Sequence, residues 1–384
     1  MDSFIATTPF FSSDHRALAD RIAQFVEREA EPHAPDDERD PDQALRDYVL
    51  LLAENDLLRY AVATPGEPFD LRALCIVREA LSYSSALADL AFVMQGLGTY
   101  AISLAATEHV RDFWLARART GKAIAAFAVT EPDAGSDVAA LKTVARRDDD
   151  AYIIDGRKRF ISNAGVADFY TVFARTGTRE DGRAEISAFI VSARMPGFSV
   201  AERTDMISPH PIGELELKNC KVPAEDMIGN QGDGLRLSLQ TLDMFRASVG
   251  AAACGMARRA LDESVFHAKA REQFGKHLSE HQLIQEKLAE MATELDAARL
   301  LVYRAAYLKD VGAQTSTREA SEAKLFATEA GSRIVDQAVQ IHGGSGLVRG
   351  SVAERLYRDV RALRIYEGTS EIQKLIVANQ LLKE

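Results

Sequence analysis

Residues 284–302, with the sequence IQEKLAEMATELDAARLLV, decide the fold of the C-terminal part of the chain. Their apolar side chains recur at intervals of four and three residues, which places them along one face of a helix. These side chains are Ile284, Leu288, Met291, Leu295, Ala298 and Val302. All 11 prolines of the chain lie at or before Pro223, and proline is the residue that interrupts helix interiors. The residues after Pro223 are therefore predicted to form an antiparallel bundle of at least four helices.

The middle of the chain, from about residue 122 to about residue 225, has a different pattern. It contains short runs of β-branched, aromatic and alternating residues, which are typical of strands. The runs are Ala123–Thr130, Tyr152–Asp155, Arg157–Ile161, Phe169–Ala174, Ile186–Val191 and Glu214–Leu217. The dipeptide Asp155-Gly156 between two of the runs predicts a two-residue hairpin turn. Earlier in the chain the spacing is helical again, most clearly at residues 14–31 and 72–84.

The predicted fold class is mainly α with a central β domain. We expect an N-terminal helical domain at residues 1–121, a small antiparallel β barrel at residues 122–230 and a C-terminal four-helix bundle at residues 231–384. The stretch Leu90–Thr107 is uncharged, but glycines and polar residues interrupt it. We therefore expect a buried helix hairpin there and no membrane span.

The composition excludes several classes of function. The 384 residues include 46 Lys and Arg against 57 Asp and Glu, and the formal net charge is −11 without a basic tail. A nucleic-acid or anionic-membrane partner is therefore not expected. The three cysteines lie far apart and the histidines show no metal-ligand spacing, so we expect no disulfide framework and no metal. Residues 1–9 carry no basic segment of a signal peptide, which predicts a cytoplasmic protein.

Residues 130–137, TEPDAGSD, follow a predicted strand and are rich in turn formers. One interpretation is a surface loop in which Ser136 or Asp137 caps a helix. The other is a ligand-binding loop, in which backbone N–H groups and the hydroxyls of Thr130 and Ser136 face a flat polar ligand. The pattern alone leaves both interpretations open.

Two glycine-containing segments near the C-terminus also allow two interpretations. Residues 343–346, GGSG, follow a predicted helix and are explained in part as a helix stop. Two adjacent glycines exceed what a cap requires, which favours close approach of another backbone or of a cofactor. In residues 366–372, YEGTSEI, Thr369 is a candidate N-cap of the last helix. Capping does not explain Glu367, whose carboxylate precedes the cap beside a glycine and can project into a pocket.

A third glycine pattern carries little weight. Gly96, Gly98 and Ala101 match the spacing of a dinucleotide fingerprint. However, the flanking residues have helical spacing, and no alternation of strands and helices follows. We therefore do not expect a Rossmann site.

Five segments of the chain together resemble the acyl-CoA dehydrogenase family, in order and over essentially the whole chain. Residues 127–137, FAVTEPDAGSD, are similar to the flavin and substrate loop of that family, and Phe160-Ile161-Ser162-Asn163 is similar to its Trp-Ile-Ser/Thr flavin segment. Residues 271–282 resemble its Arg-x-x-Phe-Gly…Gln segment. Residues 338–344, AVQIHGG, and 366–369, YEGT, resemble its closing motifs.

The resemblance implies an FAD cofactor, an acyl-CoA substrate and a set of residues for each. The residues expected to line the flavin are Phe127, Val129, Thr130, Ser136, Phe160, Ile161 and Ser162. Those expected to reach the FAD of a neighbouring subunit are Arg271, Phe274, Gln282, Gln340, Gly343 and Gly344. Thr369 and Glu371 are expected to hold the adenosine half of the cofactor. Those expected to contact the acyl-CoA are Ser136, Val93, Met94, Leu97, Asp243, Arg246 and Gly368. A site completed across subunits implies a homo-oligomer, typically a tetramer formed as a dimer of dimers.

The resemblance also implies a role for Glu367 as the catalytic base. In the family such a glutamate takes the α-proton of the thioester while a hydride leaves the β-carbon for the flavin, and electrons pass to electron-transfer flavoprotein. Some members carry the base at the position of Phe245, which cannot serve here, so the assignment depends on Glu367. No Lys or Arg lies between Arg78 and Arg111, which favours a neutral acyl group, as in fatty acid metabolism, of open length and branching.

The sequence departs from the family pattern in three places. Phe160 replaces a commoner tryptophan, residues 205–213 replace a Met-Gly-x-Arg segment, and residues 63–68 form a shortened loop. Two alternatives remain: an acyl-CoA oxidase or other flavoenzyme of the same fold, or a non-catalytic homologue that binds FAD or acyl-CoA. The presence of Glu367 and Arg246 favours an enzyme.

Overall fold

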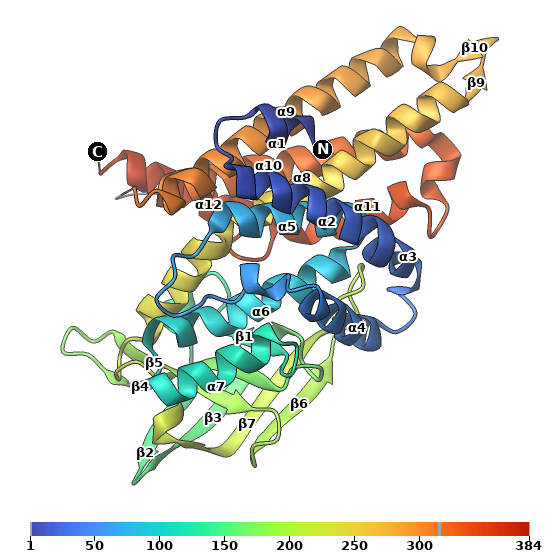
Figure 1. Cartoon of the computed structure of the whole chain (residues 1–384). Helices are drawn as coiled ribbons and strands as arrows, with labels where there is room; N and C mark the ends of the chain where they lie inside the picture. The colour runs from blue at the N-terminus through green and yellow to red at the C-terminus, as the bar shows by residue number, and fades with distance from the viewer. Residues whose placement is uncertain (1, 314–315, 384) are drawn as a thin grey trace. The chain divides into compact units, whose positions relative to one another are not determined.

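The computed structural model describes residues 2–313 and 316–383, and the chain divides into two compact units. The helical unit comprises Met1–Glu38, Asp70–Asp89 and Phe245–Glu384, and the sheet unit comprises Arg39–Phe69 and Leu90–Met244. Figure 1 labels the elements of each unit. Along the chain, helices come first, strands follow and helices return, which confirms the predicted fold class of a mainly α protein with a central β domain.

The long helices after Pro223 form most of the helical unit. They are α8 (Gly234–Ala270), whose first part belongs to the sheet unit, α9 (Gln282–Asp310), α10 (Thr317–His342), the shorter α11 (Val352–Val360) and α12 (Ser370–Leu381). The predicted stripe lies on α9, where Met291, Leu295, Ala298 and Val302 are buried. A two-stranded hairpin of β9 (Glu272–Gln273) and β10 (Lys276–His277) connects α8 and α9.

The N-terminal helices complete this unit. They are α1 (Ser3–Thr7), α2 (Ser13–Phe25), a π-helical turn (Val26–Ala30), α3 (Glu31–His33) and α5 (Leu71–Ser84). The two helices predicted at residues 14–31 and 72–84 are therefore present. Helices α5 and α8 approach so closely that a Cβ atom on Gly255 would overlap the backbone oxygen of Glu79. Glycine is required there because of this helix contact.

The sheet unit contains α4 (Pro41–Glu54), the part of α6 (Ala86–Ala105) that follows Asp89, α7 (Glu108–Arg119) and one large sheet. Its strands are β1 (Ala125–Ala128), β2 (Val144–Asp148), β3 (Ala151–Ser162), β4 (Phe169–Thr178), β5 (Ala184–Ser192), β6 (Phe198–Arg203), β7 (Ile212–Pro223) and β8 (Met227–Ile228). Hydrogen-bonded neighbours follow the order β6-β7-β3-β2-β4-β5-β8, and β1 pairs with β4. The pairings of β4 with β1 and β2 are parallel, so the sheet is mixed and the expectation of a purely antiparallel sheet was wrong.

The predicted turn at Asp155-Gly156 was also wrong. β3 runs through both residues, with a bulge where the register to β7 shifts between Ile154 and Gly156. The glycine serves close packing, because a Cβ atom on Gly156 would lie 2.7 Å from the Cα atom of Thr143. The hairpin turn lies between β2 and β3, and its first residue, Asp149, has φ +50°.

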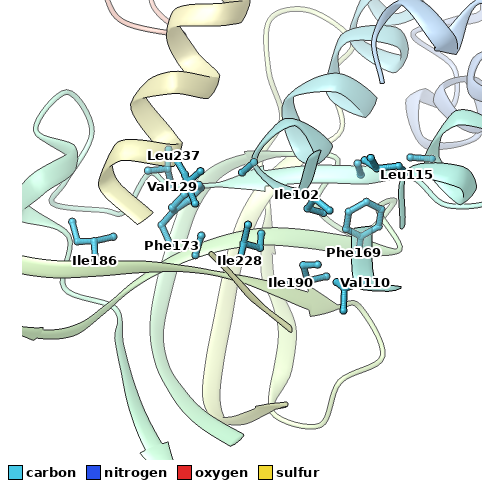
Figure 2. Packing of buried hydrophobic residues seen from close by; sticks show 14 of the residues in the cluster. Ile102, Val110, Leu115, Val129, Phe169, Phe173, Ile186, Ile190, Ile228 and Leu237 are labelled. Atoms are coloured by element: carbon cyan, nitrogen blue, oxygen red, sulfur yellow. The ribbon is translucent and has the colours of Figure 1, made fainter. Parts of the chain in front are cut away.

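The core of the sheet unit packs helices against β4 and β5. Figure 2 shows Ile102 of α6 and Leu115 of α7 beside Phe169, Ile190 and their neighbours. The expected hairpin at Leu90–Thr107 was wrong, because α6 is one continuous helix. α6 is long and apolar enough to cross a membrane, but 78% of its most apolar window is buried inside the protein. Gly98 packs against β1, since a Cβ atom there would lie 2.6 Å from that of Ala125.

Candidate active site

Glu367 lies in the turn between a 3-10 helix (Arg361–Arg364) and α12. Its backbone has φ +53°, and Gly368 follows with φ +92°. A left-handed conformation costs a non-glycine residue about 1–2 kcal/mol, so the surrounding structure must hold it. Thr369 then caps α12 as predicted, its hydroxyl accepting a hydrogen bond from the Ile372 N–H at 3.4 Å.

The carboxylate of Glu367 is buried in a charged environment. Its Oε2 atom has no hydrogen-bond partner among the described residues. Burial raises the pKa of Glu367 above its usual value, although the cations Arg78, Lys324 and Arg246 act to lower it, while Asp89 also raises it. A buried, unpartnered carboxylate with a raised pKa is suited to accept a proton from a weakly acidic group.

Arg78 on α5 is already committed to other partners. Its Nε and Nη2 atoms donate to the two carboxylate oxygens of Asp89 at 2.8 and 2.7 Å, and Nη1 donates to the Ser248 hydroxyl at 2.8 Å. Arg78 and Asp89 are 1% and 3% exposed, so this bidentate pair is fully buried. The effects of Arg78 and Asp89 on the pKa of Glu367 are therefore opposite, because Arg78 lowers this pKa and its partner Asp89 raises it.

In the sheet unit, the predicted ligand loop is held by Glu131. The carboxylate of Glu131 is buried and accepts hydrogen bonds from the backbone N–H groups of Lys142 and Thr143 at 2.5 and 3.0 Å. It also accepts one from Nζ of Lys158 at 2.8 Å, and that ammonium contacts the carbonyl oxygen of Val129 at 3.2 Å. Burial lowers the pKa of Lys158 to about 8 even though Glu131 opposes this change. The backbone before the loop, at Val129, and the backbone after the 3-10 helix that follows it, at Lys142 and Thr143, are therefore attached to one buried ion pair.

The structure tests the capping interpretation of residues 130–137. The 3-10 helix that follows (Val138–Ala140) receives no side-chain cap from Asp137, so capping does not account for the motif. Ser136 is exposed and Thr130 is half-buried in this unit. The backbone of the loop, by contrast, is fixed by Glu131.

The end of β3 presents an aromatic ring to solvent. Phe160 is 51% exposed and has φ +54°, with the guanidinium of Arg159 at 5.0 Å from its ring centre. Ile161 is buried, and the hydroxyl of Ser162 is 2.8 Å from Nε2 of His210. Burial lowers the pKa of His210 to about 4, so this imidazole is neutral at neutral pH. Residues 205–213 thus touch the predicted flavin segment through His210.

The residues expected to contact the acyl group are divided between the units. Val93, Met94 and Leu97 are buried on α6 in the sheet unit. Burial and nearby Asp243 raise the pKa of Tyr100 in the same unit to about 12. Arg246, which is buried, lies with Glu367 in the helical unit.

The residues expected to reach a neighbouring subunit's FAD form a separate, exposed group in the helical unit. Phe274, at the tip of the β9–β10 hairpin, is 94% exposed, and Arg271, Gln282 and Gln340 are exposed as well. The end of α10 is tied to the end of α8, because the rings of His267 and His342 stack with centroids 4.4 Å apart.

The structure therefore places the predicted site residues in three groups. Glu367, Gly368, Thr369 and Arg246 lie together in the helical unit. The exposed group at the ends of α8 and α10 contains Arg271, Phe274, Gln282, Gln340, Gly343 and Gly344, and Glu371 is exposed on α12. The sheet unit holds Phe127, Val129, Thr130, Ser136, Phe160, Ile161, Ser162, Val93, Met94, Leu97 and Asp243.

Sequence reasoning missed the charged residues that support these groups. Lys324 and Arg78 face Glu367, and Lys158 pairs with Glu131 behind the loop. One signal could have found Lys324. It lies at helical spacing with Ala320, Ala327 and other small residues, so that a charge interrupts an apolar face of α10.

Three observations fit a large, flat, phosphate-bearing cofactor such as FAD. The exposed ring of Phe160 offers a stacking surface, and the loop after β1 offers hydroxyls and backbone N–H groups. Gly343 and Gly344 have no described atom within 4 Å of a Cβ position, so their backbone is open to a partner outside the described chain. Among the described residues, no group of three or more His, Cys, Asp or Glu side chains is arranged to hold a metal ion.

Comparison with known proteins assigns all three parts of the chain. Residues 12–122 match the N-terminal domain, residues 126–220 the middle domain and residues 232–382 the C-terminal domain of acyl-CoA dehydrogenases. The chain is 38% identical over 382 residues to a 3-(aryl)acrylate reductase of Clostridium sporogenes, covering 97% of this chain and 100% of that protein. It is 37% identical to a cyclohexane-1-carbonyl-CoA dehydrogenase of Geobacter metallireducens, covering 81% and 82% of the two chains.

Solved structures agree with these relatives. The butyryl-CoA dehydrogenase of Megasphaera elsdenii superposes with a TM-score of 0.89 at 32% identity, covering 97% of this chain and 99% of that one. An acyl-CoA dehydrogenase of Bacillus anthracis complexed with FAD superposes with a TM-score of 0.88 at 32% identity, covering 98% of this chain and 68% of that one.

Proposed function

Because the chain belongs to the acyl-CoA dehydrogenase family, whose members are FAD-dependent oxidoreductases that dehydrogenate acyl-CoA, we propose that Glu367 is the base that takes the α-proton. The observation that carries this proposal is the buried, unpartnered Oε2 atom of Glu367 on a left-handed backbone. A thioester α-hydrogen is weakly acidic, and a base with a raised pKa removes it more readily. After transfer, the neutral acid suits the buried position better than the carboxylate did.

The FAD site is proposed from the same family relationship. FAD, when bound, supplies the acceptor for the β-hydride. In the sheet unit, the residues proposed to hold it are Phe127, Val129, Thr130, Ser136, Phe160, Ile161 and Ser162. In the helical unit, the residues proposed to reach the FAD of a second subunit are Arg271, Phe274, Gln282, Gln340, Gly343 and Gly344, and Thr369 and Glu371 are proposed to hold the adenosine half of the cofactor. The exposure of the residues at the ends of α8 and α10 supports a homo-oligomer, and we propose a homotetramer built as a dimer of dimers.

The proposed substrate is an acyl-CoA with a neutral acyl group. Arg78, the cation that faces Glu367 from α5, is satisfied by Asp89 and is not free to bind a second carboxylate. Val93, Met94 and Leu97, the residues proposed to line the acyl pocket, are apolar. Ser136, Asp243, Arg246 and Gly368 complete the proposed contacts. Cyclic acyl groups are included because one similar relative is a cyclohexane-1-carbonyl-CoA dehydrogenase.

Turnover would require an acceptor for the two electrons taken from the substrate, and the proposed acceptor is electron-transfer flavoprotein, as the family resemblance implies. We also propose a cytoplasmic location. Cys75, Cys220 and Cys254 are free and buried, as expected in a reducing compartment.

The test uses the purified holoenzyme with a panel of acyl-CoAs of four to twelve carbons, together with branched, cyclohexane-carbonyl and dicarboxylic ones. Under anaerobic conditions, a matched neutral acyl-CoA should bleach the flavin absorbance and yield the 2-enoyl product. Bleaching by none of them would refute the proposed dehydrogenation. Faster reoxidation by oxygen than by electron-transfer flavoprotein would favour the oxidase alternative.

The base assignment has its own test. Glu367→Gln should lower the rate of flavin bleaching by at least about a hundredfold while FAD and acyl-CoA still bind. Glu294→Gln is the matched control, because Glu294 pairs with Arg333 on the surface between α9 and α10. A Glu367→Gln protein as fast as this control would refute the assignment.

A further inference from the structure

Lys324 is an unusual residue for the interior of a helical unit. It lies on α10 with its side chain fully buried. Its Nζ atom donates a hydrogen bond to the carbonyl oxygen of Gly368 at 2.7 Å. Lys158, the other fully buried lysine, is hydrogen-bonded to a carboxylate. The hydrogen bond recorded for Lys324 is to a neutral backbone group directly after Glu367.

Gln373, on the first turn of α12, makes a second attachment to the same segment. Its Nε2 atom donates to the carbonyl oxygens of Glu367 at 3.2 Å and Gly368 at 3.0 Å, and its side chain is fully buried. A Cβ atom on Gly368 would lie 2.5 Å from this nitrogen, so a glycine is needed for the approach. Two buried donors thus hold the carbonyls of a dipeptide in which both residues are left-handed.

Electrostatics couples Lys324 to Glu367 as well. Burial lowers the pKa of Lys324 to about 8, and Glu367 is the neighbour that most strongly opposes this. Arg246 on α8 also lowers it, while Glu329 on α10 and Glu371 on α12 act with Glu367. For Glu367 itself, the facing charges are Arg78 on α5, Asp89 on α6, Arg246 and Lys324.

From this geometry we propose that Lys324 is a positioning residue of the reaction: it anchors the Gly368 carbonyl so that the carboxylate of Glu367 is aimed at the substrate, and it supplies a positive charge beside that carboxylate. The proposal rests on the proposed role of Glu367 as base. Fixing a base within a fraction of an ångström matters because small displacements of a reacting group can cost about a hundredfold in rate.

The charge gives the proposal a distinctive consequence. Glu367 must be ionised to take a proton, so the rate of flavin reduction rises as the pH increases through its pKa. This rise is the acidic limb of the pH profile. Removing the positive charge of Lys324 disfavours the carboxylate, which raises the pKa of Glu367 and moves the acidic limb to higher pH. A residue that only stabilised the fold would lower the rate without moving the limb.

The experiment measures the anaerobic rate of flavin reduction from pH 5.5 to 9.5 with a saturating acyl-CoA. Lys324→Met should lower the rate at pH 7 by about ten- to a hundredfold, leave KM within about threefold and move the acidic limb up by about one pH unit. Lys324→Arg keeps the charge but not the shape of the side chain. Its acidic limb should therefore lie close to that of the wild type, whereas its rate should stay below the wild-type rate. Lys287→Met is the control, since Lys287 donates to the Gln337 amide elsewhere in the helical unit.

Three results would overturn the proposal. They are a Lys324→Met limb identical to that of the control, a loss of rate equal at every pH, or a Lys324→Arg limb displaced as far as that of Lys324→Met. If Lys324→Met does not retain FAD, the same measurement is made with Lys324→Gln, which also lacks the charge but has a polar end group. The base assignment is tested separately, because only a Glu367→Gln protein that remains active would refute it. An inactive Glu367→Gln with an unshifted Lys324→Met limb would reject the role of Lys324 alone.

Discussion

The buried pair of Glu131 and Lys158 allows a stability prediction to be worked out in detail. In Glu131→Gln, the single amide oxygen must replace two carboxylate oxygens, which accept from Lys142 N–H, Thr143 N–H and Lys158 Nζ. One buried donor therefore loses its acceptor, at a cost of about 1–3 kcal/mol. The countercharge of Lys158 is lost as well.

The pH dependence of that second loss can be calculated. With an unfolded pKa of 10.5, holding Lys158 neutral at pH 7 costs about 5 kcal/mol. In the wild type, the folded pKa of about 8 limits the cost to about 3 kcal/mol. Without Glu131 the folded pKa of Lys158 falls further, so in the variant the cost at pH 7 is close to the value of about 5 kcal/mol for a fully neutral lysine. At pH 9 the lysine is mostly neutral in both proteins, and the difference nearly vanishes.

We therefore expect Glu131→Gln to destabilise the sheet unit by about 2–5 kcal/mol at pH 7 and by about 1–3 kcal/mol at pH 9. Urea unfolding followed by tryptophan fluorescence measures this unit. The single tryptophan, Trp114, lies in it and packs on Phe169 with ring centroids 4.3 Å apart. The exposed Glu180→Gln serves as control. A loss below about 1 kcal/mol at pH 7, or one that grows with pH, would refute the reasoning.

Three further predictions concern the proposed cofactor segments. Phe160→Ala should weaken FAD binding at least about tenfold but change the unfolding midpoint little, because the ring is exposed; equilibrium dialysis with FAD and a urea titration compare the two. His210, with a pKa of about 4 against 6.5 when unfolded, binds fewer protons in the folded state between these values. Stability should therefore fall as the pH decreases from 6.5 to 4, and His210→Gln should flatten this dependence in urea titrations. Gly343→Ala, at φ +60° and ψ −136°, a conformation that essentially only glycine adopts, should cost about 1–3 kcal/mol in thermal unfolding, whereas Gly344→Ala should not, and size-exclusion chromatography should show weaker assembly for both.

Much of the fold could be predicted from the sequence because the relevant signals are local. The stripe on α9 and the absence of proline after Pro223 specify long helices whatever the rest of the chain does. The dipeptide Asp155-Gly156 led to a wrong prediction of a turn, because a glycine permits close packing as well as a turn. The deciding contact is with Thr143, on a neighbouring segment that no local pattern reveals.

The candidate site divides in a similar way. Glu367 and Thr130 lie in motifs that are dense in glycine, threonine and acidic residues, and such motifs stand out in a sequence. Lys324 lies 43 residues before Glu367 in an alanine-rich helix, where a lone lysine normally faces solvent. Its burial follows from the packing of α10 against α12, which depends on the tertiary structure.

Each of the two units contains a buried lysine beside the proposed site, and the two lysines differ in a way that bears on function. Each unit holds a segment of the proposed site with a fully buried lysine whose pKa burial lowers to about 8. Lys158 is matched by a hydrogen-bonded carboxylate, Glu131, that has no part in the proposed chemistry, so its charge is balanced throughout a reaction cycle. Lys324 is balanced mainly by Glu367, which becomes neutral when it accepts a proton. The charge of Lys324 is therefore least well compensated just after proton transfer, which favours return of Glu367 to the carboxylate. Through this coupling the charge of Lys324 would assist release of the proton, whereas its hydrogen bond to the Gly368 carbonyl positions Glu367 for capture, and Lys324→Met should slow both steps.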